Sequence, residues 1–204
     1  MAAGRYGVAS RILRAQPGRL RPSTIRRMRA VRLFAMDVDG VLTEGHLPYT
    51  EASGVSVDAR IFAVKDGLAI AEAIGAGIRC AVITSKKGPA VRRRCMDLGI
   101  ADLVTGRDDK GPALLELLAE AGLSPAETAY VGDDLQDLSA LRVAGLAIAP
   151  SDAAPEVLAA VHHITRAPGG AGCVREVLRD ILIAQDHWGG IVRRHSGGDR
   201  PSAP

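Results

Sequence analysis

Asp37 and Asp39 stand two residues apart, directly after the apolar run 31–36, and Gly40 follows them. Two carboxylates at the end of a buried strand repel each other unless a cation or a proton lies between them. Gly40 lets the backbone turn sharply at this point. Taken alone, such a pair also fits a solvated turn or a helix cap. Its meaning therefore depends on which other groups converge on it.

Further polar groups stand where other apolar runs of the chain end. They are Thr84, Lys110, Asp133, Asp134 and Asp137. In a doubly wound sheet the carboxyl ends of the strands meet at one edge, so we expect these groups to converge with the first two aspartates. Carboxylates in such a place suit Mg²⁺, which binds through one or two of them and a substrate phosphate. With that cation bound, a carboxylate can attack phosphorus while a lysine and a threonine hold the phosphoryl oxygens.

Each of these residues also has a purely structural interpretation. Lys110 fits a solvated lysine at a helix start, and Thr84 fits a helix cap. Asp134 and Asp137 stand in the first turn of a helical segment, where the helix dipole favours acids. Their joint placement at strand ends favours phosphoryl chemistry over four unrelated coincidences.

Short β-rich runs alternate with amphipathic segments from residue 31 onward, which predicts an α/β fold with a doubly wound parallel sheet. Strands are expected at 31–37, 78–84, 102–105, 127–131, 145–149 and 162–165. Helices are expected at 66–76, 88–98, 110–121, 134–143, 155–161 and 172–186. The stretch 44–65 is too long for a simple connection, and its alternation predicts a β-hairpin flap after the first strand.

Charge divides the chain into a basic start and an acidic body. Nine of the 26 basic residues lie in 1–36, which holds no acid, so 17 basic residues face 23 acidic ones in the remainder. We expect 1–30 to be a disordered basic tail, 31–186 to be the folded domain and 187–204 to be a flexible tail. An organellar transit peptide or a nucleic-acid-binding arm remains an alternative for the basic start, although nucleic acid is not the expected partner.

Compartment and membrane association can also be addressed from the sequence. The start lacks the apolar core of a secretory signal, and the chain has no apolar stretch long enough to span a bilayer. Cys80, Cys95 and Cys173 are an odd number and stand in apolar periodic segments. We expect buried free thiols and a cytoplasmic protein without membrane partners.

With these residues the chain resembles the haloacid dehalogenase superfamily of phosphatases. Its four short motifs match Asp37-x-Asp39-Gly40, Thr84, Lys110 and Gly132-Asp133-Asp134-x-x-Asp137. Further stretches at 62–67, 94–100, 130–135 and 169–176 resemble the 3-deoxy-D-manno-octulosonate 8-phosphate phosphatase family, over about residues 31–186. The resemblance implies a Rossmann-like sheet without a large cap domain, Mg²⁺, an acidic keto-sugar phosphate as substrate, and a homotetramer. In that tetramer the flaps assemble, and the glycine-rich segment 169–172 approaches a neighbour's site.

The resemblance also implies roles for individual residues. Asp37 would be the nucleophile that forms an aspartyl-phosphate, and Asp39 the general acid and base. Metal ligands would be Asp37, the Asp39 carbonyl and Asp133, while Asp134 and Asp137 would orient the metal site and Lys110. Thr84 and Lys110 would hold the phosphoryl group. Substrate contacts would come from Asp39, Ala63, Val64, Lys65, Asp66, Gly67, Lys86, Arg94 and Lys110.

Two departures from the family pattern concern the substrate. Octulosonate phosphatases usually read Val-Arg-Asp-Gly and Thr-Gly-Arg, where this chain has Val64-Lys65-Asp66-Gly67 and Thr84-Ser85-Lys86. Lysine keeps the charge but lacks the planar fork that pairs with a carboxylate through two hydrogen bonds. A phosphatase for a nonulosonate or another sugar phosphate therefore remains an alternative. A catalytically idle oligomerisation module of the same fold is a third, which the retained aspartates and Lys110 argue against.

Overall fold

The computed structural model describes residues 20–48, 51–52, 55–56 and 58–197. Six strands form one sheet, namely β1 (Leu33–Met36), β4 (Arg79–Thr84), β5 (Asp102–Thr105), β6 (Thr128–Val131), β7 (Leu146–Ala149) and β8 (His163–Ile164). Their order is β5-β4-β1-β6-β7-β8, and all neighbours are parallel. The chain winds outward from β1 first through β4 and then through β6, so the carboxyl ends of these three strands meet where the winding reverses.

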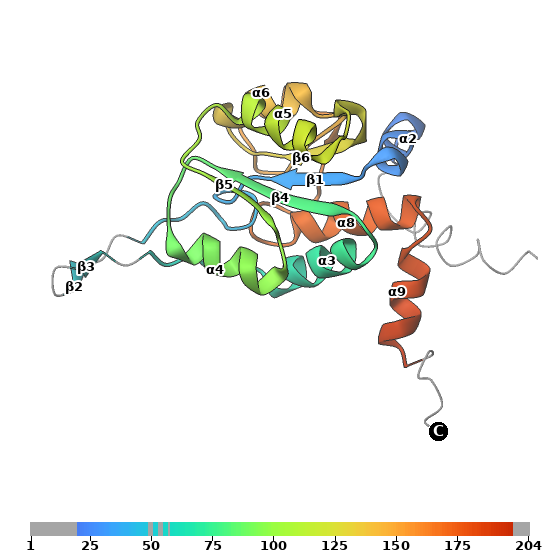
Figure 1. The fold of residues 1–204 in the computed structure, drawn as a ribbon, viewed down its shortest axis with the longest axis horizontal. Helices are drawn as coiled ribbons and strands as arrows, with labels where there is room; N and C mark the ends of the chain where they lie inside the picture. The colour runs from blue at the N-terminus through green and yellow to red at the C-terminus, as the bar shows by residue number, and fades with distance from the viewer. Residues whose placement is uncertain (1–19, 49–50, 53–54, 57, 198–204) are drawn as a thin grey trace, which may run out of the picture.

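Helices cover both faces of the sheet (Figure 1). One face carries α2 (Pro22–Ala30), α3 (Val64–Gly75), α4 (Pro89–Leu98), α8 (Cys173–Ala184) and α9 (Trp188–His195). The other carries α5 (Lys110–Ala121), α6 (Leu138–Val143) and α7 (Pro155–Ala160). Two short 3₁₀ turns are also present, η1 (Pro125–Glu127) before β6 and η2 (Leu135–Asp137) before α6. The predicted doubly wound α/β fold is confirmed, and the helix expected at 134–143 divides into η2 and α6.

Strand β1 shows how the sequence builds two cores around the sheet. Phe34 and Met36 are fully buried in the core beneath α3 and α8, whereas Leu33 and Ala35 are fully buried in the core beneath α5 and α6. Alternate side chains of a strand point to opposite faces, so a strand covered on both sides must be apolar throughout. The unbroken apolar run before Asp37 is therefore what the centre of a parallel sheet requires.

A short hairpin projects from the body between β1 and α3 (Figure 1). Its strands β2 (Glu51–Ala52) and β3 (Val55–Ser56) are antiparallel, with Glu51 opposite Ser56 and Ala52 opposite Val55. It lies within the 44–65 segment, where a hairpin was expected, although residues 49–50, 53–54 and 57 are outside the described residues. The leg after β3 returns to the edge of the sheet where β1 ends, since Arg60 of this leg contacts Asp39.

Two helices lie in segments that the sequence assigned to tails. In α2 of the predicted tail 1–30, Thr24 and Met28 are buried, and the Gln185 side chain donates hydrogen bonds to Met28 O at 3.0 Å and Val31 O at 2.8 Å. In α9 of the predicted tail 187–204, Trp188 and Ile191 are buried in the core. Both tail boundaries are therefore wrong for these helices, because each helix has one face that packs on the core.

All three cysteines lie within the described residues. Cys80, Cys95 and Cys173 are free and buried, as expected. Burial raises the pKa of the Cys80 and Cys173 thiols to about 12, so both are protonated near neutral pH. None of the helices in the described part of the chain combines the length and the apolarity that crossing a bilayer requires.

Candidate active site

Asp37 at the end of β1 meets Lys110 at the start of α5. Lys110 Nζ lies 2.9 Å from Asp37 Oδ2 and 2.8 Å from Asp137 Oδ1. The lysine side chain is only 1% exposed, so these two carboxylates replace its water. Burial lowers the pKa of Lys110, but the charges of Asp37 and Asp137 outweigh burial and raise that pKa above its ordinary value. Lys110 is thus a fixed buried cation and not a solvated surface lysine.

Asp137 organises this edge of the sheet. It is fully buried, and its Oδ1 accepts hydrogen bonds from Lys110 Nζ and from the Tyr130 hydroxyl, the latter at 2.7 Å. Its Oδ2 accepts the backbone N–H groups of Asp133 at 2.9 Å and Asp134 at 3.3 Å. Four donors satisfy this carboxylate, so Asp137 is suited to hold its neighbours in place. Tyr130 was not predicted, because a buried tyrosine on β6 carries no sign in the sequence of what its hydroxyl contacts.

Asp37, Asp133 and Asp137 form a cluster that is short of positive charge. One oxygen of each lies within 4.8 Å of the others, and the Lys110 ammonium pairs with two of them, Asp37 and Asp137. Burial, followed by the charge of Asp137, raises the pKa of Asp37 and of Asp133 to about 7. A divalent cation would supply the missing charge. Because the oxygens of Asp137 already accept four hydrogen bonds, Asp37 and Asp133 are the side chains that fit such a cation.

Gly40 makes room for Asp133 beside the Asp37 turn. A Cβ on Gly40 would lie 1.9 Å from Asp133 Oδ2, and the φ angle of Gly40 is +89°. Any side chain here would both strain the backbone and displace that carboxylate. Gly40 N–H donates to Thr43 O at 3.1 Å, which closes the turn. The requirement for glycine after the second aspartate is thus a packing requirement of the Asp133 carboxylate.

The glycine-rich segment 169–172 packs on this same turn within the chain. A Cβ on Gly169 would lie 1.9 Å from Gly40 O, and one on Gly170 would lie 2.4 Å from Glu44 N. Gly170 N–H donates to Val41 O at 2.9 Å. These contacts within the chain account for the glycines at 169 and 170, and the predicted approach of this segment to a neighbouring subunit's site stays a prediction.

Thr84 ends β4 beside β1. It is 1% exposed, and its Oγ1 accepts the backbone N–H of Lys86 at 3.2 Å. The hydroxyl proton is therefore still available to donate to a phosphoryl oxygen. The Lys86 side chain is exposed, as one that meets an incoming substrate must be.

The predicted substrate stretch 63–67 forms the start of α3, and its members differ in exposure. Asp66 is 1% exposed, and its Oδ1 accepts the Arg175 backbone N–H at 2.7 Å. Its Oδ2 is buried and has no hydrogen-bond partner among the described residues, and burial raises the pKa of Asp66. Asp66 therefore lies behind the surface that a ligand could touch, and its contact joins α3 to α8. Ala63 is half-buried, and Val64 is exposed.

Lys65 and Arg94 each lie close to the backbone of a glycine. Lys65 is exposed, and a Cβ on Gly172 would lie 2.6 Å from its Cε. Arg94 of α4 passes over Gly67, where a Cβ would lie 2.4 Å from Arg94 Nη2. The Arg94 guanidinium also lies over Phe62, 5.5 Å from the ring centroid. Lys65 therefore stands next to the segment that packs on the Gly40 turn, and Arg94 is held against the helix that begins there.

Arg60 contacts the second aspartate of the motif and was not predicted from the sequence. Its Nε lies 3.0 Å from Asp39 Oδ1, and its Nη2 lies 3.4 Å from Asp39 Oδ2. Its Nη1 pairs with Asp58 Oδ1, and Asp58 Oδ2 accepts the Ala90 N–H at 3.0 Å. The Arg60 side chain is 5% exposed. Its position in the predicted flap offered no sign of this contact, because loop arginines are usually solvated.

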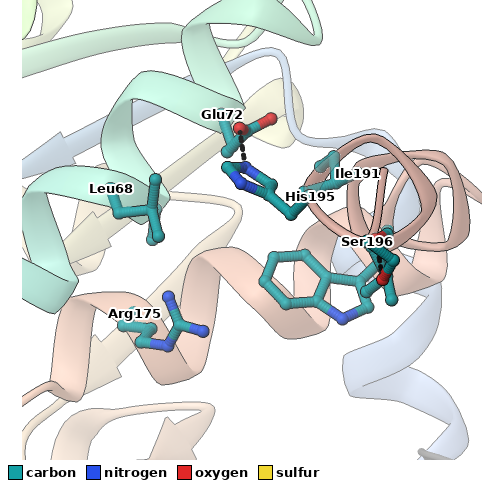
Figure 2. Close-up of a pocket in the computed structure, with 9 residues that line it drawn as sticks. Leu68, Glu72, Arg175, Ile191, His195 and Ser196 are labelled. Carbon is teal, nitrogen blue, oxygen red and sulfur yellow. Dashed lines mark hydrogen bonds and ion pairs between the residues drawn. The ribbon is translucent and has the colours of Figure 1, made fainter. Parts of the chain in front are cut away.

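A separate pocket lies between α3, α8 and α9 (Figure 2). Leu68, Glu72, Arg175, Trp188 and His195 are among the residues that line it. The Arg175 guanidinium lies over Trp188, 5.7 Å from the ring centroid, and Glu72 pairs with His195 Nε2 at 2.7 Å. The pocket contains none of the predicted catalytic or metal-binding residues. Arg175, which belongs to the stretch 169–176 that carries part of the family resemblance, lies here.

Known proteins with similar sequences indicate the family of this chain. A family model described as haloacid dehalogenase-like hydrolase matches residues 91–175. The 3-deoxy-D-manno-octulosonate 8-phosphate phosphatase KdsC of Yersinia pestis is 40% identical over 175 residues, which cover 86% of this chain and 92% of that protein. The similarity therefore extends over nearly the whole of that relative.

Solved structures agree with the sequence comparison. A 3-deoxy-D-manno-octulosonate 8-phosphate phosphatase from Moraxella catarrhalis, in complex with magnesium, phosphate and KDO, has a TM-score of 0.81 and 37% identity and covers 84% of this chain and 97% of its own. A probable YrbI family phosphatase from Pseudomonas syringae has a TM-score of 0.84 and 38% identity and covers 88% and 100%. Both likenesses include the sheet that carries the aspartate cluster.

Proposed function

The chain belongs to the 3-deoxy-D-manno-octulosonate 8-phosphate phosphatases among the haloacid dehalogenase-like hydrolases, and we propose that it hydrolyses that sugar phosphate through a phosphorylated Asp37. It is a phosphatase. The observation that carries the proposal is the buried contact of Asp37 with Lys110, beside Asp133. Three proposed groups thus lie close together: the nucleophile at the end of β1, the cation for the phosphoryl oxygens at the start of α5, and a second metal-binding carboxylate after β6.

Asp37 is the proposed nucleophile. Its carboxylate oxygen attacks phosphorus, and the bond from phosphorus to the sugar oxygen breaks. Lys110, held by Asp37 and Asp137, faces the phosphoryl group as its negative charge shifts toward the leaving oxygen. Thr84 donates its hydroxyl proton to a phosphoryl oxygen from the end of the neighbouring strand. The product of this half-reaction is an aspartyl-phosphate and a sugar alkoxide that needs a proton.

Asp39 is the proposed source of that proton. As a carboxylic acid it protonates the leaving sugar oxygen, and as the resulting carboxylate it removes a proton from water. The water oxygen attacks phosphorus, the bond to Asp37 breaks, and phosphate leaves. Asp39 stands on the same turn as Asp37, so both half-reactions use one fixed geometry.

Magnesium fits the donor set. Asp37 and Asp133 are the side chains positioned to hold it, with the Asp39 carbonyl as a third protein ligand. When bound, Mg²⁺ neutralises the carboxylates and the phosphate so that one anion can approach another. Without it, the raised pKa values of Asp37 and Asp133 indicate a cluster that holds protons in place of a metal.

Lys65, Lys86 and Arg94 are the proposed contacts for an acidic sugar. Lys65 and Lys86 are exposed, and Arg94 is half-buried. Together they offer positive charge to a substrate carboxylate. Two of the three are lysines, which bind as point charges without the planar fork of arginine. Point charges tolerate a longer acidic sugar better than a bidentate clamp does. A nonulosonate phosphate is therefore the competitor to include in any assay.

We also propose a cytoplasmic homotetramer. The support for assembly is an apolar stripe beside the site, in which Ile61 is 90% exposed and Val64 is 84% exposed. The support for the compartment is that Cys80, Cys95 and Cys173 are all free. Sedimentation of the chain and of an Ile61→Ser, Val64→Ser variant tests the assembly. A monomeric parent protein would contradict it.

The activity is tested by phosphate release across a panel of sugar phosphates in the presence of Mg²⁺. The panel contains the 8-phosphate of 3-deoxy-D-manno-octulosonate, a nonulosonate 9-phosphate, and glucose 6-phosphate as a neutral-sugar control. We expect the octulosonate phosphate to give the highest kcat/KM. A higher value for the nonulosonate would assign the enzyme to that sugar, and equal values for all three would show that the cations do not select the substrate.

A further inference from the structure

Arg60, in the second leg of the hairpin, reaches the catalytic turn with its side chain. Its Nε and Nη2 each lie against a different oxygen of Asp39, at 3.0 and 3.4 Å. A guanidinium that bonds both oxygens of a carboxylate fixes the plane of that carboxylate as well as its distance. The orientation of the Asp39 carboxylate is therefore set by a residue that lies outside the Asp39 loop.

The far side of Arg60 is also held. Its Nη1 pairs with Asp58, whose Oδ2 accepts the Ala90 N–H in the first turn of α4 at 3.0 Å. Asp58 is packed closely enough on Gly88 that a Cβ there would lie 2.2 Å from its Oδ2. The Arg60 side chain is 5% exposed, against 19% for Asp39 and 22% for Asp58. The guanidinium thus sits between a helix start and the carboxylate that it orients.

We propose that Arg60 is a positioning residue that holds the Asp39 carboxylate in the orientation needed for proton transfer to the leaving group and from water. The proposal rests on the assignment of Asp39 as general acid and base. Each carboxylate oxygen has more than one lone pair, so an oxygen that accepts an N–H from Arg60 can still carry or receive a proton on its other side. A misplacement of about 1 Å in a reacting group costs roughly a hundredfold in rate, which is the scale of effect that such a clamp controls.

The test separates proton transfer from the rest of the reaction. The parameter kcat/KM covers the chemistry up to phosphorylation of Asp37, where Asp39 matters only if the leaving group needs a proton. Phenyl phosphate needs it, whereas 2,4-dinitrophenyl phosphate releases a stable phenolate. For Arg60→Gln we expect kcat/KM to fall roughly 10- to 100-fold with phenyl phosphate and less than about threefold with the dinitrophenyl ester.

Three further variants make the result specific. Arg79→Gln is the matched control, because Arg79 also forms a two-bonded pair with a carboxylate, that of Asp102, but at the opposite end of β4. It should leave both substrates unchanged. Arg60→Lys keeps the charge without the fork and should show the same substrate dependence at a smaller size. Should Arg60→Gln fail to fold by circular dichroism, Arg60→Lys and Asp58→Asn carry the test.

The outcomes distinguish this proposal from the assignment of Asp39. If Arg60 acts through Asp39, Arg60→Gln should have no further effect on phenyl phosphate in an Asp39→Asn background. Equal losses for both esters in folded Arg60→Gln, or no loss, would overturn the positioning role while Asp39→Asn still shows the dependence on the leaving group. If Asp39→Asn itself lacks that dependence, the general-acid assignment fails first, and the role of Arg60 fails with it.

Discussion

The ammonium of Lys110 and the carboxylate of Asp37 lie 2.9 Å apart in a place where the lysine is almost entirely shielded from water. The two groups come from the end of β1 and the start of α5. A buried charge pair of this kind costs solvation free energy and is retained where its geometry serves a function. Here it holds a cation against the group that we assign as nucleophile.

Asp37→Asn should abolish turnover, because an amide does not attack phosphorus. The rate should fall by more than about a hundredfold while the fold is kept. Asp97→Asn is a suitable control, since Asp97 forms only an exposed pair with Arg93 on α4. Steady-state phosphate release measures the loss, and acid quenching of the parent enzyme should trap phosphate on Asp37. A variant with parental activity would remove Asp37 from the mechanism.

Asp133 and Asp137 should respond differently to the same isosteric change. Asp137→Asn places an amide among four donors, so the free energy of unfolding should fall by about 3–5 kcal/mol, as when one partner of a buried pair is removed. Asp133→Asn should instead raise the Mg²⁺ concentration needed for activity, with little loss of stability. Thermal melting and Mg²⁺ titration of activity measure the two effects. Identical behaviour of the two variants would contradict the separation of ligand from organiser.

Stabilisation by Mg²⁺ should grow with pH. The pKa of Asp37 and of Asp133 is raised from 3.8 to about 7 in the metal-free fold, so the folded chain holds protons that the unfolded chain has already released. Their contribution to stability is therefore present below pH 3.8 and is lost as the pH rises toward 7. Mg²⁺ replaces those protons, and its affinity rises as they leave.

This pH dependence is measured as the difference in Tm between excess Mg²⁺ and excess chelator. The difference should be small at pH 5.5 and should increase until it levels off above about pH 8, one unit beyond the raised pKa values. The Asp133→Asn variant should show a flatter increase, because one of the two titrating ligands is missing. A difference in Tm that stays constant over this range would show that proton release and metal binding are not linked.

Gly169→Ala should impair the active site without touching a catalytic residue. Its Cβ would lie 1.9 Å from Gly40 O, so the turn that carries Asp39 must shift, at a cost of about 1–3 kcal/mol in stability and with a lower kcat. Gly75→Ala is the matched control, since a Cβ there meets nothing within 4 Å at the end of α3. It should stabilise the protein by about 0.5–1 kcal/mol. Unchanged activity in Gly169→Ala would show that the turn tolerates movement.

Met28→Ala should destabilise the fold, because Met28 is fully buried although it lies in the basic N-terminal region. Removal of a buried methionine costs about 2–5 kcal/mol. Arg26→Ala, at an exposed position of the same helix, should change stability by less than about 0.5 kcal/mol. Denaturant unfolding measures both. Equal stability of the two variants would mean that α2 does not contribute to the core.

The sequence by itself determined the strands of the sheet and the edge at which its polar residues converge. Apolar runs of strand length followed by helical periodicity identified all six strands of the sheet. The pattern is clearest for β1, β6 and β7, because a strand buried on both faces has few polar positions to confuse it. Asp37, Lys110 and Asp133 could be predicted to converge, since parallel strands place their carboxyl ends together. The family motifs rest on these same positions.

Only the tertiary structure decided which side chains touch. Arg60 and Asp39, or Tyr130 and Asp137, are joined by contacts that depend on how separate elements pack, and no local pattern encodes such contacts. The same reason explains why α2 was not predicted. Its two buried residues stand among arginines in the sequence, and their burial depends on packing against α8. It also explains Asp66, whose burial follows from the packing of α3 on α8. Periodicity reports which face of an element is apolar, whereas the partner of that face is set by the topology of the whole chain.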